Sequence, residues 1–210
     1  MSESEAATGA VTGPRRRAPG ERARAHVLEQ AAKLASVEGL EGLSIGRLAE
    51  ATGKPKSSVY VLFGSKEDLQ LATVDAARES FIAEVVTPAL AIASGRDRLL
   101  ALCEGFLSYV QRRVFPGGCF FVSASSELGG RPGRIHDRVA EIQREWADLL
   151  RYQAHRAKDR GELPAGADPD QVAFELGTIL AGADIVAVLH EDDSAIERAR
   201  VAIRSRLGIA

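Results

Sequence analysis

Residues 43–69 read LSIGRLAEATGKPKSSVYVLFGSKEDL and hold the strongest local signals in the chain. Ser44 can cap the start of a short helix, and Gly53 can end it, because glycine readily adopts the left-handed conformation found at helix C-termini. Pro55 suits the first turn of a second short helix, which runs to about Phe63. Two short helices separated by a glycine turn have the dimensions of a helix-turn-helix.

The second of these helices has an apolar side and a polar side. Val59, Leu62 and Phe63 can fasten it to a scaffold. The side chains left outward are Lys54, Lys56, Ser57, Ser58, Tyr60 and Val61. Cations, hydroxyls and a phenol suit phosphate oxygens and the edges of bases, and valine can contact a thymine methyl group. An ordinary exposed helix pair with a solvated charged face has the same spacing and is the alternative interpretation.

Over about residues 22–72 the chain resembles the DNA-binding domain of the tetracycline-repressor-like (TetR) family of bacterial regulators. The matching elements are the Ala/Leu-rich stretch 31–39, Ser44, LAEATG at 48–53, YVLF at 60–63 and SKEDL at 65–69. The resemblance implies that Tyr60 and Lys66 contact phosphates and that Ser58 and Ser44 hold the DNA backbone. Lys66 also lies in the first turn of a helix capped by Ser65, where the peptide dipoles favour an anion.

Departures from the family pattern affect sequence specificity. Lys54 stands where an apolar residue is common, and Pro55 stands where a polar cap is common. Val61 and Leu62 stand where many members carry a polar or aromatic pair. Direct base readout therefore falls mainly to Lys54, Lys56, Ser57 and Arg47.

The net charge of −2 argues against nucleic-acid binding only when the chain is taken as a whole. Residues 14–66 hold ten basic and five acidic residues, whereas the chain after residue 70 holds 17 basic and 20 acidic ones. A basic front on a mildly acidic body is typical of a domain that meets phosphates joined to one that does not. Arg15, Arg16 and Arg17 lie in a front arm that can reach a minor groove or be a solvated tail.

The whole chain after the arm has helical periodicity, without alternating β-branched runs. The pattern predicts an all-α fold of about nine helices, divided into a flexible basic arm (1–20), a helix-turn-helix domain (21–68) and a ligand-binding and dimerisation domain (69–210). Glycine and proline breaks place the body helices at 96–113, 118–128, 134–160, 169–190 and 193–207. A longer helix starts after Ser65, and Gly39 stops the first one.

The body holds most of the aromatic residues, which predict a cavity between helices or, alternatively, plain core packing. The candidate ligand-binding residues are Phe106, Tyr109, Phe120, Phe121, Trp146 and Phe174. Segment 116–128, PGGCFFVSASSEL, resembles a glycine–cysteine segment of one TetR subgroup. Its small residues allow two helices to approach closely or leave room for a ligand, and the sequence does not decide between these.

The stretch 169–190 is apolar around much of its helical circumference, so its own short partner helix cannot cover it. A two-fold four-helix bundle would cover it, and burial within one protomer is the alternative. The residues assigned to the dimer contact are Val172, Leu176, Ile179, Ala183 and Val186.

Enzyme motifs are absent from the sequence: no Glu-x-x-His pair, no His-Glu-x-x-His and no glycine-rich phosphate loop occurs. Cys103 and Cys119 lack metal-ligand spacing and lie in apolar surroundings, where small buried hydrophobes are typical. We find no signal-peptide core, and no uncharged apolar stretch approaches the ~18 residues that span a bilayer.

Together these features predict a cytoplasmic transcriptional regulator rather than an enzyme, with no cofactor, no metal and no membrane contact. We expect a homodimeric repressor that a small, mainly apolar ligand releases from a palindromic double-stranded DNA operator. Two alternatives stay open. One is a protein of this fold that acts by binding a partner, and the other is a regulator switched by oxidation of Cys103 or Cys119.

Overall fold

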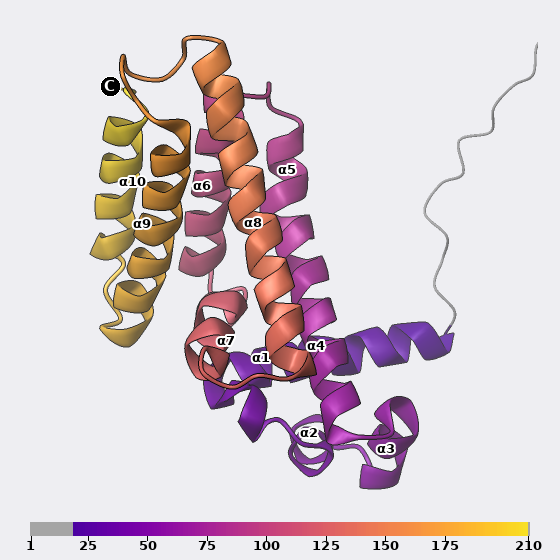
Figure 1. Cartoon of the computed structure of the whole chain (residues 1–210). Coiled ribbons are helices and arrows are strands. Elements are labelled where there is room, and N and C mark those ends of the chain that lie inside the picture. The colour runs from indigo at the N-terminus through magenta and orange to yellow at the C-terminus, as the bar shows by residue number, and fades with distance from the viewer. Residues whose placement is uncertain (1–18, 210) are drawn as a thin grey trace, which may run out of the picture.

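The computed structural model describes residues 19–209, in which the helices are joined by short turns and loops and no strand occurs. One end of the molecule consists of α1 (Pro19–Gly42), α2 (Ile45–Thr52) and α3 (Lys56–Phe63). The body consists of α4 (Lys66–Phe81), the π-helical turn η1 (Ile82–Val86), α5 (Thr87–Leu90), α6 (Arg96–Gln111), α7 (Phe120–Leu128), α8 (Arg134–Asp159), α9 (Pro169–Leu189) and α10 (Ser194–Arg206). Figure 1 shows α1, α2 and α3 at one end of the molecule and the long helices of the body side by side above them.

The predicted all-α fold is confirmed. The segments α4, η1 and α5 follow one another without a break, so the described residues form nine continuous helical segments. The five body helices begin and end within two residues of the positions that the glycine and proline breaks predict. Residues 1–18, which include Arg15, Arg16 and Arg17, lie outside the described part of the chain.

Helix α1 differs from its prediction at both ends. It begins at Pro19, inside the stretch assigned to the arm, and it continues beyond Gly39 to Gly42. At Gly39 the backbone takes φ 78° and ψ 162°, so the helical geometry is broken there as glycine allows. Residues 40–42 form one further turn on the other side of this break.

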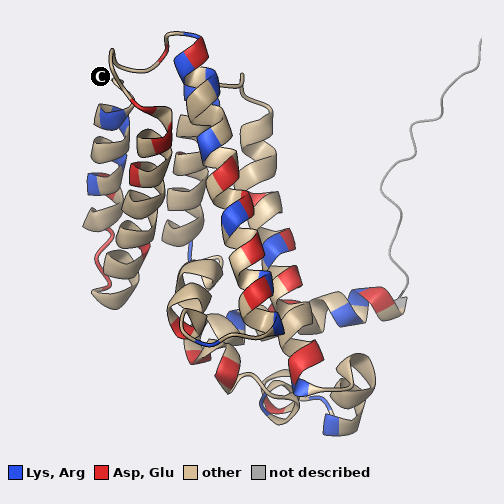
Figure 2. Cartoon of the chain, in the orientation of Figure 1, with Lys and Arg blue, Asp and Glu red and all other residues tan. Residues whose placement is uncertain are grey.

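The helices α4 and α8 run side by side along the molecule, and α4 connects α3 to the body (Figure 1). Buried residues such as Leu69 and Val74 on α4 belong to one core that extends from α1 to α10. Figure 2 shows that acidic and basic residues alternate along both helices. Three ion pairs, each 2.8 Å long, join them: Glu67–Arg134, Asp75–Arg138 and Arg78–Glu145.

By length and composition α9 is apolar enough to cross a membrane, the one such helix in residues 19–209. Glu175 and Asp184 interrupt its apolar sequence, and Val172, Leu176 and Leu180 are buried against neighbouring helices. A core helix of a helical bundle passes the same test of length and composition.

Candidate nucleic-acid interface and internal cavity

The turn between α2 and α3 is built by the local signals that the sequence predicts. The Ser44 hydroxyl accepts a hydrogen bond of 3.1 Å from the Arg47 backbone N–H and so caps α2. Gly53 ends α2 with φ 62°, in the left-handed region. The Ser65 hydroxyl caps α4 in the same way, accepting from the Asp68 N–H at 3.0 Å. These predicted caps are confirmed, and they fix the orientation in which α3 leaves the scaffold.

Helix α3 buries Val59 and Phe63, and the guanidinium of Arg24 on α1 lies 5.2 Å from the centre of the Phe63 ring. Its other side is open to solvent: Tyr60 is 59% exposed and Val61 is 83% exposed. Lys56, Ser57 and Ser58 are exposed with them, while Lys54 in the preceding turn is half-buried. Two large apolar side chains among hydroxyls and cations make a surface that a partner has to cover to shield it from water.

Lys66 also lies at this end of the molecule, in the first turn of α4. Its ammonium group donates to the main-chain oxygen of Glu41 at 2.8 Å and lies 3.4 Å from the Glu41 carboxylate. The cation is therefore held at a fixed place beside the end of α1, with half of its side chain open to solvent. Such a pre-positioned ammonium group has a further N–H that it can donate to a phosphate oxygen.

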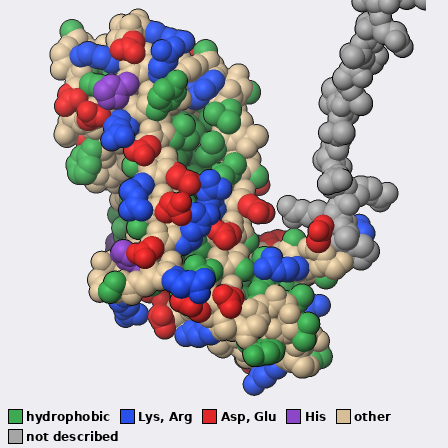
Figure 3. Space-filling model, turned by 45° about the vertical axis from the view of Figure 1, so that its right-hand side comes forward, with side chains coloured by type: hydrophobic (Ala, Val, Ile, Leu, Met, Phe, Trp, Pro, Cys, Tyr) green, Lys and Arg blue, Asp and Glu red, His purple; other side chains and the backbone are tan. Residues whose placement is uncertain are grey.

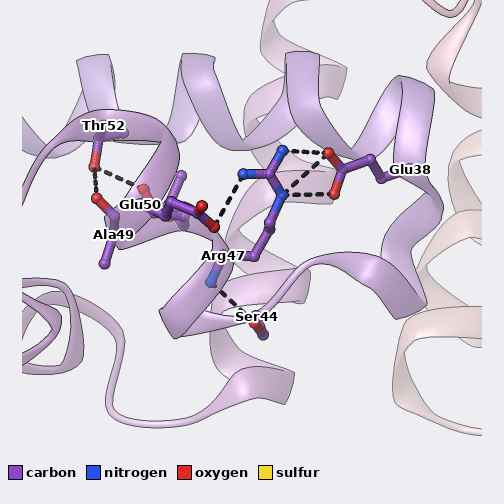
Figure 4. Close-up of polar contacts among 7 residues, drawn as sticks. Glu38, Ser44, Arg47, Ala49, Glu50 and Thr52 are labelled. Atoms are coloured by element: carbon purple, nitrogen blue, oxygen red, sulfur yellow. Dashed lines mark hydrogen bonds and ion pairs between the residues drawn. The ribbon is translucent and has the colours of Figure 1, made fainter.

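Arg47 is placed differently from the other predicted DNA contacts (Figure 4). Its Nε donates to both Glu38 carboxylate oxygens, at 2.9 and 3.1 Å, and its Nη1 lies 3.4 Å from Glu50. Hydrogen bonding to Arg47 lowers the pKa of Glu38, so this pair is ionised at neutral pH. Arg47 thus ties α2 to α1, and its predicted role as a base reader requires that this pair opens.

A cavity of about 750 Å³ lies in the body and is lined by α4, η1, α6, α7, α8 and α9. Phe106, Phe121, Trp146 and Phe174, four of the predicted ligand-binding residues, line it. Figure 3 shows hydrophobic side chains gathered on the surface of the body between charged ones. The volume and apolar lining are those of a site for a small organic molecule.

The other two predicted ligand-binding residues, Tyr109 and Phe120, do not line the cavity. Both rings are buried in the core, where Tyr109 packs edge-on against Phe81 at 5.7 Å between centroids. The residue that the sequence analysis missed is Phe81, which lines the cavity and meets Trp146 edge-on at 5.1 Å. No local pattern in the sequence marks Phe81 as a cavity residue; its position directly before the π-turn η1, a feature frequent at functional sites, is visible only in the structure.

Most of the cavity lining is apolar, but polar and charged side chains also take part in it, among them Asp148, Arg151, Asp170 and Thr178. Gln143 is another, and its amide nitrogen donates to the Ser125 hydroxyl at 2.8 Å and to the Phe121 carbonyl at 3.3 Å. Arg78 and Glu145 lie among the lining residues as an ion pair. Cys119 lines the cavity as well, and burial raises the pKa of its thiol to about 12.

The two cysteines share this property, because burial also raises the pKa of Cys103 to about 12. At neutral pH both are thiols rather than thiolates, and the thiolate is the form that reacts with oxidants. Their burial fits the interpretation as small core hydrophobes and speaks against the thiol-switch alternative.

The residues assigned to the dimer contact need correction. Val172, Leu176 and Ala183 are buried within the protomer, and Ile179 is half-buried on the side of α9 next to α10. Only Val186 of that set is exposed. Together with Val186, the solvent face of α9 is formed by residues spaced along one stripe of the helix: Phe174, Thr178, Gly182, Ile185 and Leu189. We call this set the α9 face.

Comparison with known proteins agrees with this architecture. Residues 27–73 match the family model described as bacterial regulatory proteins, tetR family, and residues 95–203 match the tetracyclin repressor-like C-terminal domain. The transcriptional repressor AcnR of Corynebacterium glutamicum is 43% identical over 161 residues, which cover 76% of this chain and 78% of AcnR.

Solved structures agree as well. A TetR regulator from Chloroflexus aurantiacus has a TM-score of 0.79 and 30% identity, covering 89% of this chain and 94% of its own. AibR, solved with isovaleryl coenzyme A and operator DNA, has a TM-score of 0.70 and shares the fold at 21% identity, covering 89% of this chain and all of its own (100%). The protein described above, with its helix-turn-helix and its helical cavity domain, therefore belongs to the TetR family of bacterial transcriptional regulators.

Proposed function

We propose that this protein is a cytoplasmic, homodimeric repressor that binds a palindromic operator and is released from it by a small, mainly apolar effector. The observation that carries the proposal is the outer side of α3, where Tyr60 and Val61 stand exposed beside Lys56, Ser57 and Ser58. Lys66 adds a positioned cation next to it. The relative AcnR is named as a repressor, which favours repression over activation.

Removal of the phosphate contacts tests DNA binding. Tyr60→Ala combined with Lys66→Ala is expected to weaken binding to the palindrome upstream of the gene by about 1,000-fold, since the dimer loses four phosphate contacts, two from each protomer, of about 1 kcal/mol each. Fluorescence anisotropy with labelled operator DNA measures the change. Lys158→Ala, at the far end of α8, is the matched control and should bind as the wild type does.

An unchanged affinity in the double variant, or wild-type affinity no stronger than that for random DNA, would contradict DNA recognition by this face. The second outcome would favour the alternative in which the same fold acts through a protein partner. Both titrations need the same salt concentration, because phosphate contacts weaken steeply as salt rises.

The dimer contact that we propose uses the α9 face together with Val201 on α10, which is 69% exposed. Phe174 and Leu189, at 68% and 72% exposed, lie near opposite ends of this stripe, and Gly182 in its middle permits close approach of a second helix. A second copy covers the stripe by two-fold symmetry, as in a four-helix bundle. Two copies also provide the two recognition helices that a palindrome requires.

A charge placed on this face tests the dimer. Ile185→Glu is expected to raise the dimer dissociation constant by about 30-fold or more, because the two-fold axis brings two uncompensated carboxylates into one apolar contact. Sedimentation velocity across a concentration series measures it. Glu191→Gln, just beyond the end of α9, is the control. A variant that stays dimeric at all concentrations would place the contact elsewhere.

The effector is assigned to the cavity around Phe81, Phe106 and Trp146. Its size and apolar lining support a mainly apolar ligand, with Gln143 available for one polar group. AibR, which shares the fold, was solved with both an acyl coenzyme A and its operator. Binding acts only if the two conformations bind the ligand unequally, and a 100-fold release from the operator requires about 2.7 kcal/mol of coupling.

A further inference from the structure

Helix α7 lies next to α1, at the end of the body nearest to α2 and α3 (Figure 1). Phe121 in its first turn lines the cavity, and Glu127 near its end contacts α1. The helix itself is only nine residues long, so a displacement at one end is carried rigidly to the other. The function of segment 116–128 was left open by the sequence, and these contacts answer it.

Segment 116–128 contacts α1 at two points. Before α7, the Gly117 N–H donates to the Ser36 hydroxyl at 3.2 Å, and the two backbones approach so closely that a Cβ on Gly117 would lie 1.8 Å from the Ser36 carbonyl oxygen. Near the end of α7, the Glu127 carboxylate accepts hydrogen bonds of 2.8 Å from the backbone N–H groups of both Leu40 and Glu41. The small residues therefore serve close helix approach at this point.

The Glu127 contact satisfies a specific need of the chain. Because α1 is broken at Gly39, the N–H groups of Leu40 and Glu41 lie directly after a break in the helical backbone, where groups at a helix terminus need partners from outside the helix. A carboxylate supplies two acceptor oxygens, one for each N–H, and both hydrogen bonds are charge-assisted. A Cβ on Gly39 would lie 2.9 Å from a Glu127 oxygen, so the left-handed glycine also makes room for the contact.

The two residues held by Glu127 are linked in turn to α4. The Glu41 carbonyl accepts from the Lys66 ammonium group at 2.8 Å, and the Leu40 carbonyl accepts from the buried Gln70 amide. One peptide segment is thus bonded through its N–H groups to α7 and through its carbonyls to α4. Glu41 therefore contacts both Glu127 and Lys66, the residue that we assign to a phosphate contact.

At its other end α7 is tied to the cavity. The Phe121 carbonyl and the Ser125 hydroxyl both accept from Gln143, a cavity-lining residue of α8. A molecule that displaces the Phe121 ring or forms a hydrogen bond with the Gln143 amide therefore directly changes the position of α7. The contacts form a continuous chain from the cavity wall to the end of α1.

We propose that Glu127 is a positioning residue that links the cavity to the DNA contact by holding Glu41, and through it Lys66, at the end of α1. The proposal rests on the proposed function, because Lys66 is assigned there to the operator backbone. In this arrangement an effector shifts α7, and the hydrogen bonds from the N–H groups of residues 40 and 41 to Glu127 weaken. As a result, Lys66 is no longer held in a fixed position beside the duplex.

The test compares Glu127→Gln with Ser126→Ala, a neighbouring substitution that removes only a hydrogen bond within α7. Glutamine keeps the size of the side chain but offers one acceptor oxygen and turns an amide donor toward the other N–H. We expect the Gln variant to bind the operator about tenfold more weakly and the Ala control to bind as the wild type does. Hydrogen exchange should show faster exchange at residues 40 and 41 in the Gln variant only.

A double-mutant cycle with Lys66→Ala separates positioning from a general loss of structure. If Glu127 acts through Lys66, Glu127→Gln adds little to the loss already caused by Lys66→Ala, so the two effects are far from additive. Additive losses of affinity, or a Gln variant with wild-type affinity, would overturn the proposal while the proposed function stands. A wild-type protein that does not distinguish operator from random DNA overturns the proposed function itself.

Discussion

Gly117→Ala is expected to lower the free energy of unfolding by about 3 kcal/mol, equivalent to a fall of about 10 °C in Tm for a chain of this length. The added Cβ would lie 1.8 Å from the Ser36 carbonyl oxygen and 2.5 Å from its carbon. Both are main-chain atoms in the interior of α1, so no side-chain rotation relieves the clash. The loop before α7 must move away, and the hydrogen bond from Gly117 to Ser36 is lost with it.

The matched control is Gly130→Ala, in the turn after α7. A Cβ there meets nothing within 4 Å, and the change should stay within about 0.5 kcal/mol of the wild type. Thermal unfolding at one fixed protein concentration measures both variants, because the Tm of an oligomer depends on concentration. Equal Tm values for the two alanine variants would mean that residues 112–119 can leave α1 at little cost.

Asp184→Asn is expected to stabilise the protein increasingly as pH rises, gaining about 2 kcal/mol over the wild type between pH 4.5 and 7.5. Asp184 is buried on α9, and the one hydrogen bond that its carboxylate accepts here is from the Cys119 N–H, at 2.8 Å. Desolvation raises the pKa of Asp184 from 3.8 to about 6, although this hydrogen bond and Arg113 act in the opposite direction.

The sign follows from the direction of this pKa shift. The folded protein holds the Asp184 proton more tightly than the unfolded chain, so the unfolding free energy falls as pH rises from about 4 to about 6. Above about pH 6 the full penalty of a buried carboxylate is present. Asparagine stays neutral and retains an acceptor oxygen for the Cys119 N–H, so the variant lacks this penalty.

Urea unfolding of wild type and variant at pH 4.5 and 7.5 measures the effect. The other carboxyl groups contribute equally to the unfolding free energies of the two proteins, so their contributions cancel in the difference. Among them are Glu38 and Glu175, whose pKa values are lowered by their hydrogen bonds and which therefore stabilise the fold more as pH rises. Asp148→Asn, an exposed carboxylate on α8, is the control and should show no such trend. A wild-type-to-variant difference that does not change with pH would show that Asp184 is solvated in the folded state.

The helix boundaries and the helix-turn-helix could be predicted because their signals are local. Ser44, Gly53 and Ser65 act on backbone groups within four residues of themselves, and the structure shows each in the predicted cap. The outward side of α3 also followed from a single helical period, since Val59 and Phe63 define which side is buried. The sequence alone therefore locates the polar set around Tyr60.

The exposed side of α9 could not be predicted from a local pattern. Apolar residues surround most of α9, so its sequence does not indicate which side meets the protomer core and which meets solvent. The contacts with α6, α8 and α10 select Val172 and Leu176 for the core and leave Phe174 and Leu189 outside. Likewise, every aromatic residue of the body is of a type that can pack in a core. Only the packing decides that Phe81 lines the cavity and that Tyr109 is buried away from it.

Local sequence was sufficient for the family, the helix-turn-helix and the caps, because hydrogen bonds and periodicity within one helix encode them. The contacts of Arg47 with Glu38, of Glu127 with residues 40 and 41, and of Gly117 with Ser36 came from the tertiary structure alone. The last two join residues more than 80 positions apart, and no local pattern specifies which distant helix comes to lie within hydrogen-bonding distance. Packing of the whole core decides it, because each helix can dock only where its neighbours leave complementary space.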